Sequence, residues 1–271
     1  MRQMYVLITL LPLLFVFIFG ACVGSFLNVV AYRIPEGLSL IHPPSRCPHC
    51  KHRLGKTENV PILGWLWLQG RCRCCKTSIS PRYPLIEAVS ALLFVLVYWQ
   101  FGASLQTIGY WTFLSWLLAL SLIDLDTMTL PNVLTKWGLM TGLGFQLLLG
   151  WQQSQIPQSL MLSVSSAVLG ILLFDSILWL GMLMLGQPAM GGGDPKLAAG
   201  IGAWLGWKLL LVGSFLACAS GALIGGGAIA LGWISRRQPI PFGPYLALGA
   251  ACALFLGDSI IQFYLEHFFL R

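Results

Sequence analysis

The chain has 271 residues, of which 57% are hydrophobic and only 9% charged, and its formal net charge at pH 7 is +7. Its mean hydropathy of +0.79 excludes an ordinary soluble domain, in which about a quarter of the residues are charged. Apolar runs of about 20 residues recur, a length that spans a bilayer as a helix. We therefore predict an all-α fold, a polytopic membrane helical bundle, and attribute the positive charge to membrane orientation, with no nucleic-acid partner.

The predicted helices form about eight membrane spans, one of them short or re-entrant. In chain order they cover residues 5–31, 84–101, 104–123, 132–150, 160–185, 194–206, 207–233 and 245–265, and 194–206 is the short one. Three regions follow from this division. They are a first transmembrane helix in 1–32, a small cytoplasmic four-cysteine zinc module in 33–83, and a membrane bundle in 84–271.

Basic residues predict the orientation of these spans. Nine of the sixteen Lys and Arg residues lie between Arg33 and Arg82, and the loop 234–243 carries two more. Because cytoplasmic loops are enriched in Lys and Arg, we expect both segments on the cytoplasmic side. Counting eight spans from there places the segments around Asp124 and Asp194 on the cytoplasmic side as well.

Two Cys-x-x-Cys pairs in the basic segment have the spacing of a structural zinc site. The predicted ligands are Cys47, Cys50, Cys72 and Cys75. Basic neighbours favour the thiolate form, and a reducing cytoplasm disfavours disulfides. Four thiolates leave no open coordination position, so we expect the metal to shape a surface rather than to catalyse.

Three nearby residues leave the ligand set open at this stage. Cys74 breaks the spacing of the second pair, and His49 and His52 are possible substitute ligands. Solvated histidines are the simpler interpretation of both.

Acidic residues occur at the ends of two apolar runs. Asp124 and Asp126 end one run, and Asp194 follows the glycines Gly191–Gly193 and precedes Lys196. An ionisable group at membrane depth costs at least ~2.5–3.5 kcal/mol, so it indicates function by default. Residues two apart on a helix point about 200° apart, so only one of Asp124 and Asp126 can face a partner. A pair with Asp194 would share a proton, as in an aspartic protease.

Structural roles compete with this interpretation. Asp194 could cap a helix after a flexible loop, with its charge favoured by the helix dipole and by Lys196. Asp175 lies in the middle of a predicted span and is as consistent with a buried hydrogen-bonded residue as with a proton path. Glu87 lies near the start of a span, where an acid complements the dipole, and function and structure are equally good explanations of it.

Several ordered motifs together resemble the bacterial type IV prepilin peptidases, which are membrane aspartic proteases of the Gly-x-Gly-Asp type. The motifs are Gly24–Arg33, the paired Cys-x-x-Cys knuckles, Gly70–Cys75, Ile79–Glu87, Ile123–Asp126 with Leu130–Asn132, Gly191–Lys196 and Pro241–Tyr245. The resemblance implies cleavage of a basic leader from prepilins and pseudopilins, after a glycine, at the cytoplasmic face of the inner membrane. It selects Asp194 and Asp124 as the catalytic acids, with Gly191, Gly193 and Lys196 supporting the catalytic loop.

The same resemblance implies a second activity. Many members with the cysteine-bearing region also methylate the new N-terminus from S-adenosylmethionine, and residues 24–87 match that bifunctional type. The cofactor site is not placed by the sequence beyond this region, in which Glu87 is a candidate. Gln187–Met190 departs from the family, since many relatives carry a charged Lys-Glu there.

Two other classes of function remain as alternatives. One is a transporter or proton channel with Asp124, Asp175 and Asp194 as a relay, which gives no reason for a zinc module. The other is a zinc-organised assembly scaffold without catalysis. Cleavage of a pilin-like peptide distinguishes all three.

Overall fold

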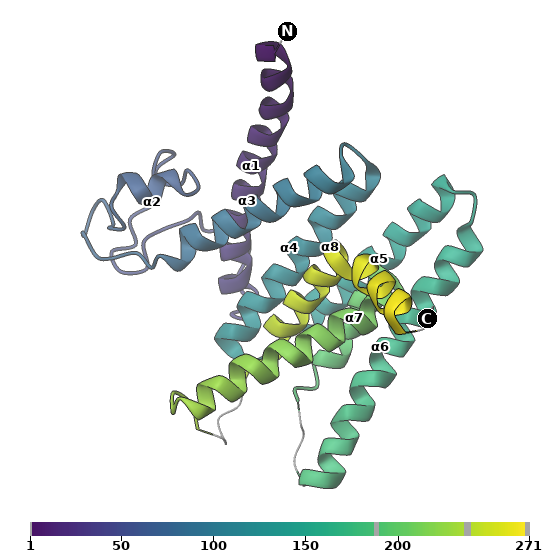
Figure 1. Ribbon diagram of the computed structural model, residues 1–271. Coiled ribbons are helices and arrows are strands. Elements are labelled where there is room, and N and C mark those ends of the chain that lie inside the picture. The colour runs from purple at the N-terminus through teal and green to yellow at the C-terminus, as the bar shows by residue number, and fades with distance from the viewer. Residues whose placement is uncertain (1, 187–189, 236–239, 269–271) are drawn as a thin grey trace. The chain divides into compact units, whose positions relative to one another are not determined.

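The computed structural model describes residues 2–186, 190–235 and 240–268, and these form eight helices without a β-strand (Figure 1). The helices are α1 (Arg2–Arg33), α2 (Leu63–Trp67), α3 (Arg82–Phe101), α4 (Leu105–Thr127), α5 (Asn132–Gln152), α6 (Ile156–Leu185), α7 (Asp194–Ala230) and α8 (Gly243–Phe268). Parts of two expected features, the basic loop 234–243 and the family departure at 187–190, lie outside the described residues. The all-α prediction is confirmed.

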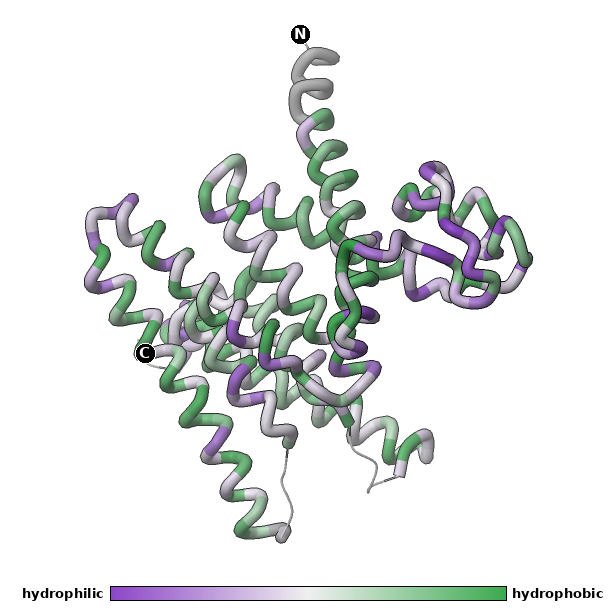
Figure 2. Tube along the Cα trace, turned by 180° about the vertical axis from the view of Figure 1, so that it is seen from behind, coloured by the Kyte–Doolittle hydropathy of each residue, from purple (hydrophilic) through white to green (hydrophobic). Residues whose placement is uncertain are grey.

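Six helices of the described ranges are long and apolar enough to cross a membrane, so the chain is a multi-pass membrane protein. They are α1, α3, α4, α6, α7 and α8. Figure 2 shows these helices mostly in hydrophobic colours, whereas the segment between α1 and α3 is largely hydrophilic. Large apolar side chains such as Trp179 and Leu183 are exposed, as lipid contact requires.

The number of spans differs from the expected eight at two places. The predicted span 132–150 is the helix α5, but it is not among the six, because Lys136, Gln146 and two threonines make it less apolar. The predicted segments 194–206 and 207–233 are joined in α7. Gly206 lies between them with a φ of 80°, a non-helical conformation that glycine adopts without steric cost. The boundary expected between the two segments is therefore a break within one helix.

The chain divides into two compact units, residues 1–119 and 120–271, each with its own packing. In the first unit α1 packs along α3. A Cβ atom on Gly24 would lie 2.7 Å from the Cα atom of Glu87, so the small residue allows the helices to approach closely. Phe94 stacks on Trp111 with ring centroids 4.9 Å apart, and the Trp111 indole donates to the Phe94 carbonyl.

In the second unit α7 packs against α5, α6 and α8. Methyl groups on Gly202 and Gly249 would overlap the carbonyl oxygens of Ser166 on α6 and Gly213 on α7, respectively. Small residues at helix contacts are typical of membrane bundles, where packing rather than water exclusion holds helices together. This packing brings the N-terminal ends of α7 and α8 into the same unit as the C-terminal end of α4.

Candidate active site and metal centre

Two buried carboxylates lie at helix ends in the second unit. Asp124, in the last turn of α4, is 5% exposed and accepts a 2.9 Å hydrogen bond from the N–H of Gly243. Asp194, the first residue of α7, is 4% exposed and accepts a 3.1 Å bond from the N–H of Gly191. The Asp194 carboxylate also lies within electrostatic range of Asp124. The structure thus brings together the two acids that the sequence paired.

The two aspartates of α4 differ in burial as helix geometry predicts. Asp124 is buried and Asp126 is exposed, because two positions on an α-helix turn a side chain by about 200°. Of these two aspartates, only Asp124 therefore places its carboxylate in the interior of the second unit.

The glycine-rich loop before α7 packs on the segment that follows α4. A Cβ atom on Gly193 would lie 2.8 Å from the Cβ atom of Leu130. The Lys196 amine donates a 2.7 Å hydrogen bond to the Asn132 side-chain oxygen. We expected the positive charge of Lys196 to favour ionisation of Asp194. The Lys196 amine binds Asn132 instead, and the described residues contain no ion pair between Lys196 and Asp194. Asn132 is the first residue of α5, which has no side-chain cap at its N-terminus.

An apolar pocket of about 240 Å³ lies beside the start of α8. Its walls come from α7 and from the segment that leads into α8, and include Cys218, Gly221, Ala222, Phe242 and Tyr245. One wall residue, Phe242, directly precedes Gly243, whose N–H binds Asp124. The apolar lining suits an apolar side chain.

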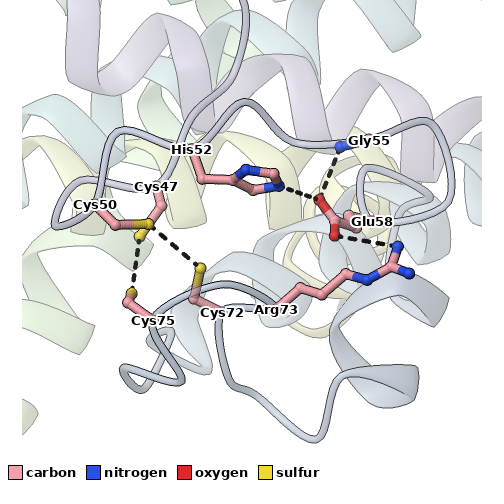
Figure 3. Close-up of polar contacts among 8 residues, drawn as sticks. All are labelled: Cys47, Cys50, His52, Gly55, Glu58, Cys72, Arg73 and Cys75. Atoms are coloured by element: carbon pink, nitrogen blue, oxygen red, sulfur yellow. Dashed lines mark hydrogen bonds and ion pairs between the residues drawn. The ribbon is translucent and has the colours of Figure 1, made fainter.

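Four cysteine thiols of the first unit converge in one cluster (Figure 3). The Sγ atoms of Cys47 and Cys75 are 3.8 Å apart, those of Cys50 and Cys72 are 3.9 Å apart, and all four lie within 4.8 Å of one another. Four sulfurs at the usual Zn–S distance of about 2.3 Å from one ion would be about 3.8 Å apart in a tetrahedron. The residues present therefore fit a tetrahedral zinc ion.

The two Cys-x-x-Cys turns have the same backbone conformation. The N–H of Cys47 donates to the His52 carbonyl and that of Cys72 to the Thr77 carbonyl, both at 2.9 Å. Lys51 and Lys76, four residues after the first cysteine of each pair, have φ values of 58° and 57°. Each pair thus presents its two thiols from an equivalent tight turn, as expected of zinc knuckles.

Hydrogen bonds favour the thiolate, the form that binds a metal, at Cys75 and Cys47. At Cys50 the backbone N–H of His52 acts in the same direction, but burial and the neighbouring thiols outweigh it and raise the pKa to about 12. Bonding to Thr77 lowers the pKa of the Cys75 thiol to about 6. The backbone N–H of Cys50 lowers the pKa of the Cys47 thiol.

Other residues near the cluster have different roles. Cys74 is exposed and does not belong to the four-thiol group. His52 contacts Glu58, with 3.7 Å between its Nε2 atom and Oε2, and His49 is not part of the group. The structure selects the four cysteines as the only candidate ligands among the described residues.

Glu58 links the two knuckles and was not anticipated from the sequence. Its side chain is 4% exposed, accepts the N–H of Gly55 at 2.8 Å, and lies 3.7 Å from a guanidinium nitrogen of Arg73 (Figure 3). With His52 on the first knuckle and Arg73 on the second, it holds both together. Glu58 is one of only two acidic residues in the basic segment 33–83. This position is the sequence signal that could have indicated its role between the knuckles.

Glu87 is buried in the first unit, beyond the first turn of α3 where the dipole would act. Its carboxylate accepts a 2.6 Å hydrogen bond from the N–H of Ile62 and another from the Ser25 hydroxyl. Glu87 thus connects α1, α3 and the segment before α2. Glu87 therefore does not complement the dipole of α3, as one interpretation of the sequence had it. Its hydrogen bonds instead hold three segments of the first unit together.

Comparison with known proteins gives two matching family descriptions. Residues 18–101 match the bacterial peptidase A24 N-terminal domain, and residues 111–226 match the type IV leader peptidase family. No solved structure is detectably similar.

Curated relatives match nearly the whole chain. A protein of Aeromonas hydrophila is 42% identical, with 93% of each chain covered. Proteins of Stutzerimonas stutzeri and Pseudomonas aeruginosa are 39% identical, with 94% of this chain and 95% of theirs covered. Each of the three is named prepilin leader peptidase/N-methyltransferase.

Proposed function

Since the chain belongs to the type IV leader peptidase family, we propose that it is a membrane aspartic endopeptidase that removes the basic leader of prepilins and pseudopilins. Cleavage follows a glycine, on the cytoplasmic side of a bacterial inner membrane. The observation that carries this proposal is the pair of buried carboxylates, Asp124 and Asp194, within electrostatic range in one unit.

The pair can hydrolyse a peptide bond when the two acids hold one proton between them. The ionised carboxylate takes a proton from water as the water oxygen attacks the scissile carbonyl carbon. The protonated carboxyl gives its proton to the leaving amine as the C–N bond breaks. The N–H groups of Gly243 and Gly191 hold one oxygen of each carboxylate, so both acids are oriented before substrate binds.

Neighbouring features would position the substrate. The loop containing Gly191 and Gly193 lacks side chains, so a peptide backbone could approach Asp194, and Lys196 anchors the end of this loop on Asn132. The apolar pocket at Phe242 and Tyr245 would bind an apolar substrate side chain next to the scissile bond.

The first unit would supply the second activity, N-methylation of the new N-terminus. S-adenosylmethionine supplies the methyl group when bound, and we place its site within residues 24–87, supported by Glu87. A structural zinc ion on Cys47, Cys50, Cys72 and Cys75 would hold the cytoplasmic knuckles together; their geometry fits that metal.

Reconstitution tests the proposal against the two alternatives. Purified protein in lipid vesicles is expected to release the leader from a prepilin peptide and to conduct no ions. Ion flux without cleavage would establish the aspartate relay, and absence of both would favour a scaffold. Asp175, the third member of the alternative relay, is half-buried on α6.

A further inference from the structure

A cavity of about 320 Å³ lies in the first unit, between the C-terminal half of α1 and the segment 40–61. Residues 22, 25, 26, 29 and 33 line it from one face of α1, as their spacing of three and four requires. Ile41, the prolines Pro43, Pro44 and Pro61, and Asn59 close the other side. The volume is in the range of small-molecule sites, which begins at about 300 Å³.

Arg33 provides a buried positive charge at this cavity. Only 9% of the residue is exposed, and its guanidinium donates to the carbonyls of Ser39 at 2.8 Å, Leu40 at 3.3 Å and Pro43 at 2.6 Å. All three acceptors are neutral, and the described part of the chain places no carboxylate in an ion pair with it. A buried cation without a counter-charge is costly, and two of its five N–H donors are left for a ligand.

Glu87 holds the two walls of the cavity in place. Its carboxylate binds the hydroxyl of Ser25, which lines the cavity from α1, and the N–H of Ile62, which follows the lining residue Pro61. The cavity is therefore braced by a buried carboxylate, as a preformed ligand site should be.

We propose that this cavity binds S-adenosylmethionine, with Arg33 pairing with the carboxylate of its amino-acid end and Phe26, Val29 and Ile41 contacting the adenosine. The inference rests on the proposed methyltransferase activity and assigns its cofactor site. The carboxylate and the aromatic purine ring of this molecule match the buried guanidinium and the apolar side chains among the lining residues. Both carboxylates of the proposed peptidase lie in the second unit, so the cavity is free for a second activity.

Thiol protection tests occupancy without an activity measurement. Cys22 lines this cavity and Cys218 lines the apolar pocket of the second unit, and both are exposed free thiols. S-adenosylhomocysteine at ten times its dissociation constant should slow alkylation of Cys22 about tenfold, read by peptide mass spectrometry, and leave Cys218 unchanged. Equal rates at Cys22 with and without ligand would overturn the proposal, as would protection by anionic phospholipid alone.

Substitution tests the two contacts separately. Val29→Trp should fill the cavity and weaken S-adenosylhomocysteine binding at least tenfold, whereas Ile18→Trp, an exposed position on the same helix, should bind normally. Wild-type protein should prefer S-adenosylhomocysteine about 10- to 100-fold over 5′-methylthioadenosine, which lacks the amino-acid end. In Arg33→Gln this preference should fall to within about threefold, a change that loss of loop structure alone would not produce.

These outcomes separate the cofactor site from the proposed function. Zinc content measured on every variant reports whether the first unit is folded. If Val29→Trp and Arg33→Gln bind both ligands like the wild type, while the wild type methylates its product, the cavity assignment fails and the methyltransferase stands. If the wild type neither binds S-adenosylhomocysteine nor methylates, the methyltransferase fails together with the cavity, and leader cleavage is judged on its own.

Discussion

At the scale of single residues, the proposed chemistry depends on two backbone N–H groups that orient two carboxylates. Gly243 donates to Asp124 and Gly191 to Asp194. The sequence indicated the acids through their place at membrane depth and through the helical angle between Asp124 and Asp126. It did not indicate the donors, because Gly243 is 119 residues from the acid that it binds.

Gly243→Ala tests the orientation of Asp124. A Cβ atom there would lie 2.7 Å from the Asp124 Oδ2 atom, so the carboxylate has to move. We expect kcat for leader cleavage to fall about 100-fold, the usual effect of displacing a reacting group by about 1 Å. Gly226→Ala on α7 has open space around it and should retain wild-type kcat. Equal activity of the two variants would exclude steric control of Asp124 by this glycine.

Lys196 and Asn132 form a second residue-scale test. Their contact at 2.7 Å ties the start of α7 to the start of α5. Lys196→Met and Asn132→Leu should each lower kcat about three- to tenfold, since one hydrogen bond contributes about 1 kcal/mol. The double variant should be no slower than either single variant, because both remove the same contact. Multiplicative losses would show that the two residues act independently.

At the scale of elements, the two zinc knuckles have the same turn conformation. The spacing of the cysteines was sufficient to predict both knuckles. The brace by Glu58 was not predictable, because its partners His52 and Arg73 become neighbours only after the two turns have met. In α7 the break at Gly206 was anticipated by the division between 206 and 207, although the helix continues on both sides. Six of the described helices meet the length and apolarity of a membrane span, α5 is too polar to be among them, and the predicted segments 194–206 and 207–233 lie in one helix.

Removal of the thiols tests the metal centre. The double variant Cys47→Ser/Cys72→Ser takes one ligand from each knuckle and should lose the zinc ion, measured by elemental analysis as metal per chain. Cys74→Ser, an exposed cysteine between two ligands, should keep the wild-type zinc content. Unchanged zinc in the double variant would refute the ligand set.

The pocket between α7 and α8 predicts substrate selectivity. A Cβ atom on Gly221 would only touch Tyr245 and Phe242, at 3.6 Å or more, so a larger side chain can extend into the pocket. Gly221→Leu should lower kcat/KM about 10- to 100-fold for peptides with phenylalanine after the scissile bond and much less for those with alanine. Gly226→Leu provides the matched control. A uniform loss for both peptides would indicate that the pocket does not contact this side chain.

At the scale of the whole molecule, the chain consists of two units that correspond to the two matched family descriptions. The first contains the knuckles and the cavity at Arg33, and the second contains both buried aspartates. Composition and apolar runs were enough to predict a helical membrane protein with a polar insert. The division after residue 119 was not predictable, because it falls inside the continuous helix α4.

The division into units predicts separable sites. Asp194→Asn should bind S-adenosylhomocysteine with wild-type affinity, since the proposed cofactor cavity lies wholly in the first unit. Isothermal titration of the two proteins in the same detergent measures this. A more than about tenfold loss of affinity would mean that the two sites are coupled, by at least about 1.4 kcal/mol.

The most direct test of the central claim is the rate of leader cleavage by single aspartate variants of the purified protein. Asp124→Asn and Asp194→Asn should each lower kcat at least about 10³-fold, because either change removes a proton-transferring group. Asp126→Asn, two residues from Asp124 but exposed, should retain most of the activity. Normal cleavage by either of the first two variants, or full loss in the third, would contradict the assignment of Asp124 and Asp194 as the catalytic pair.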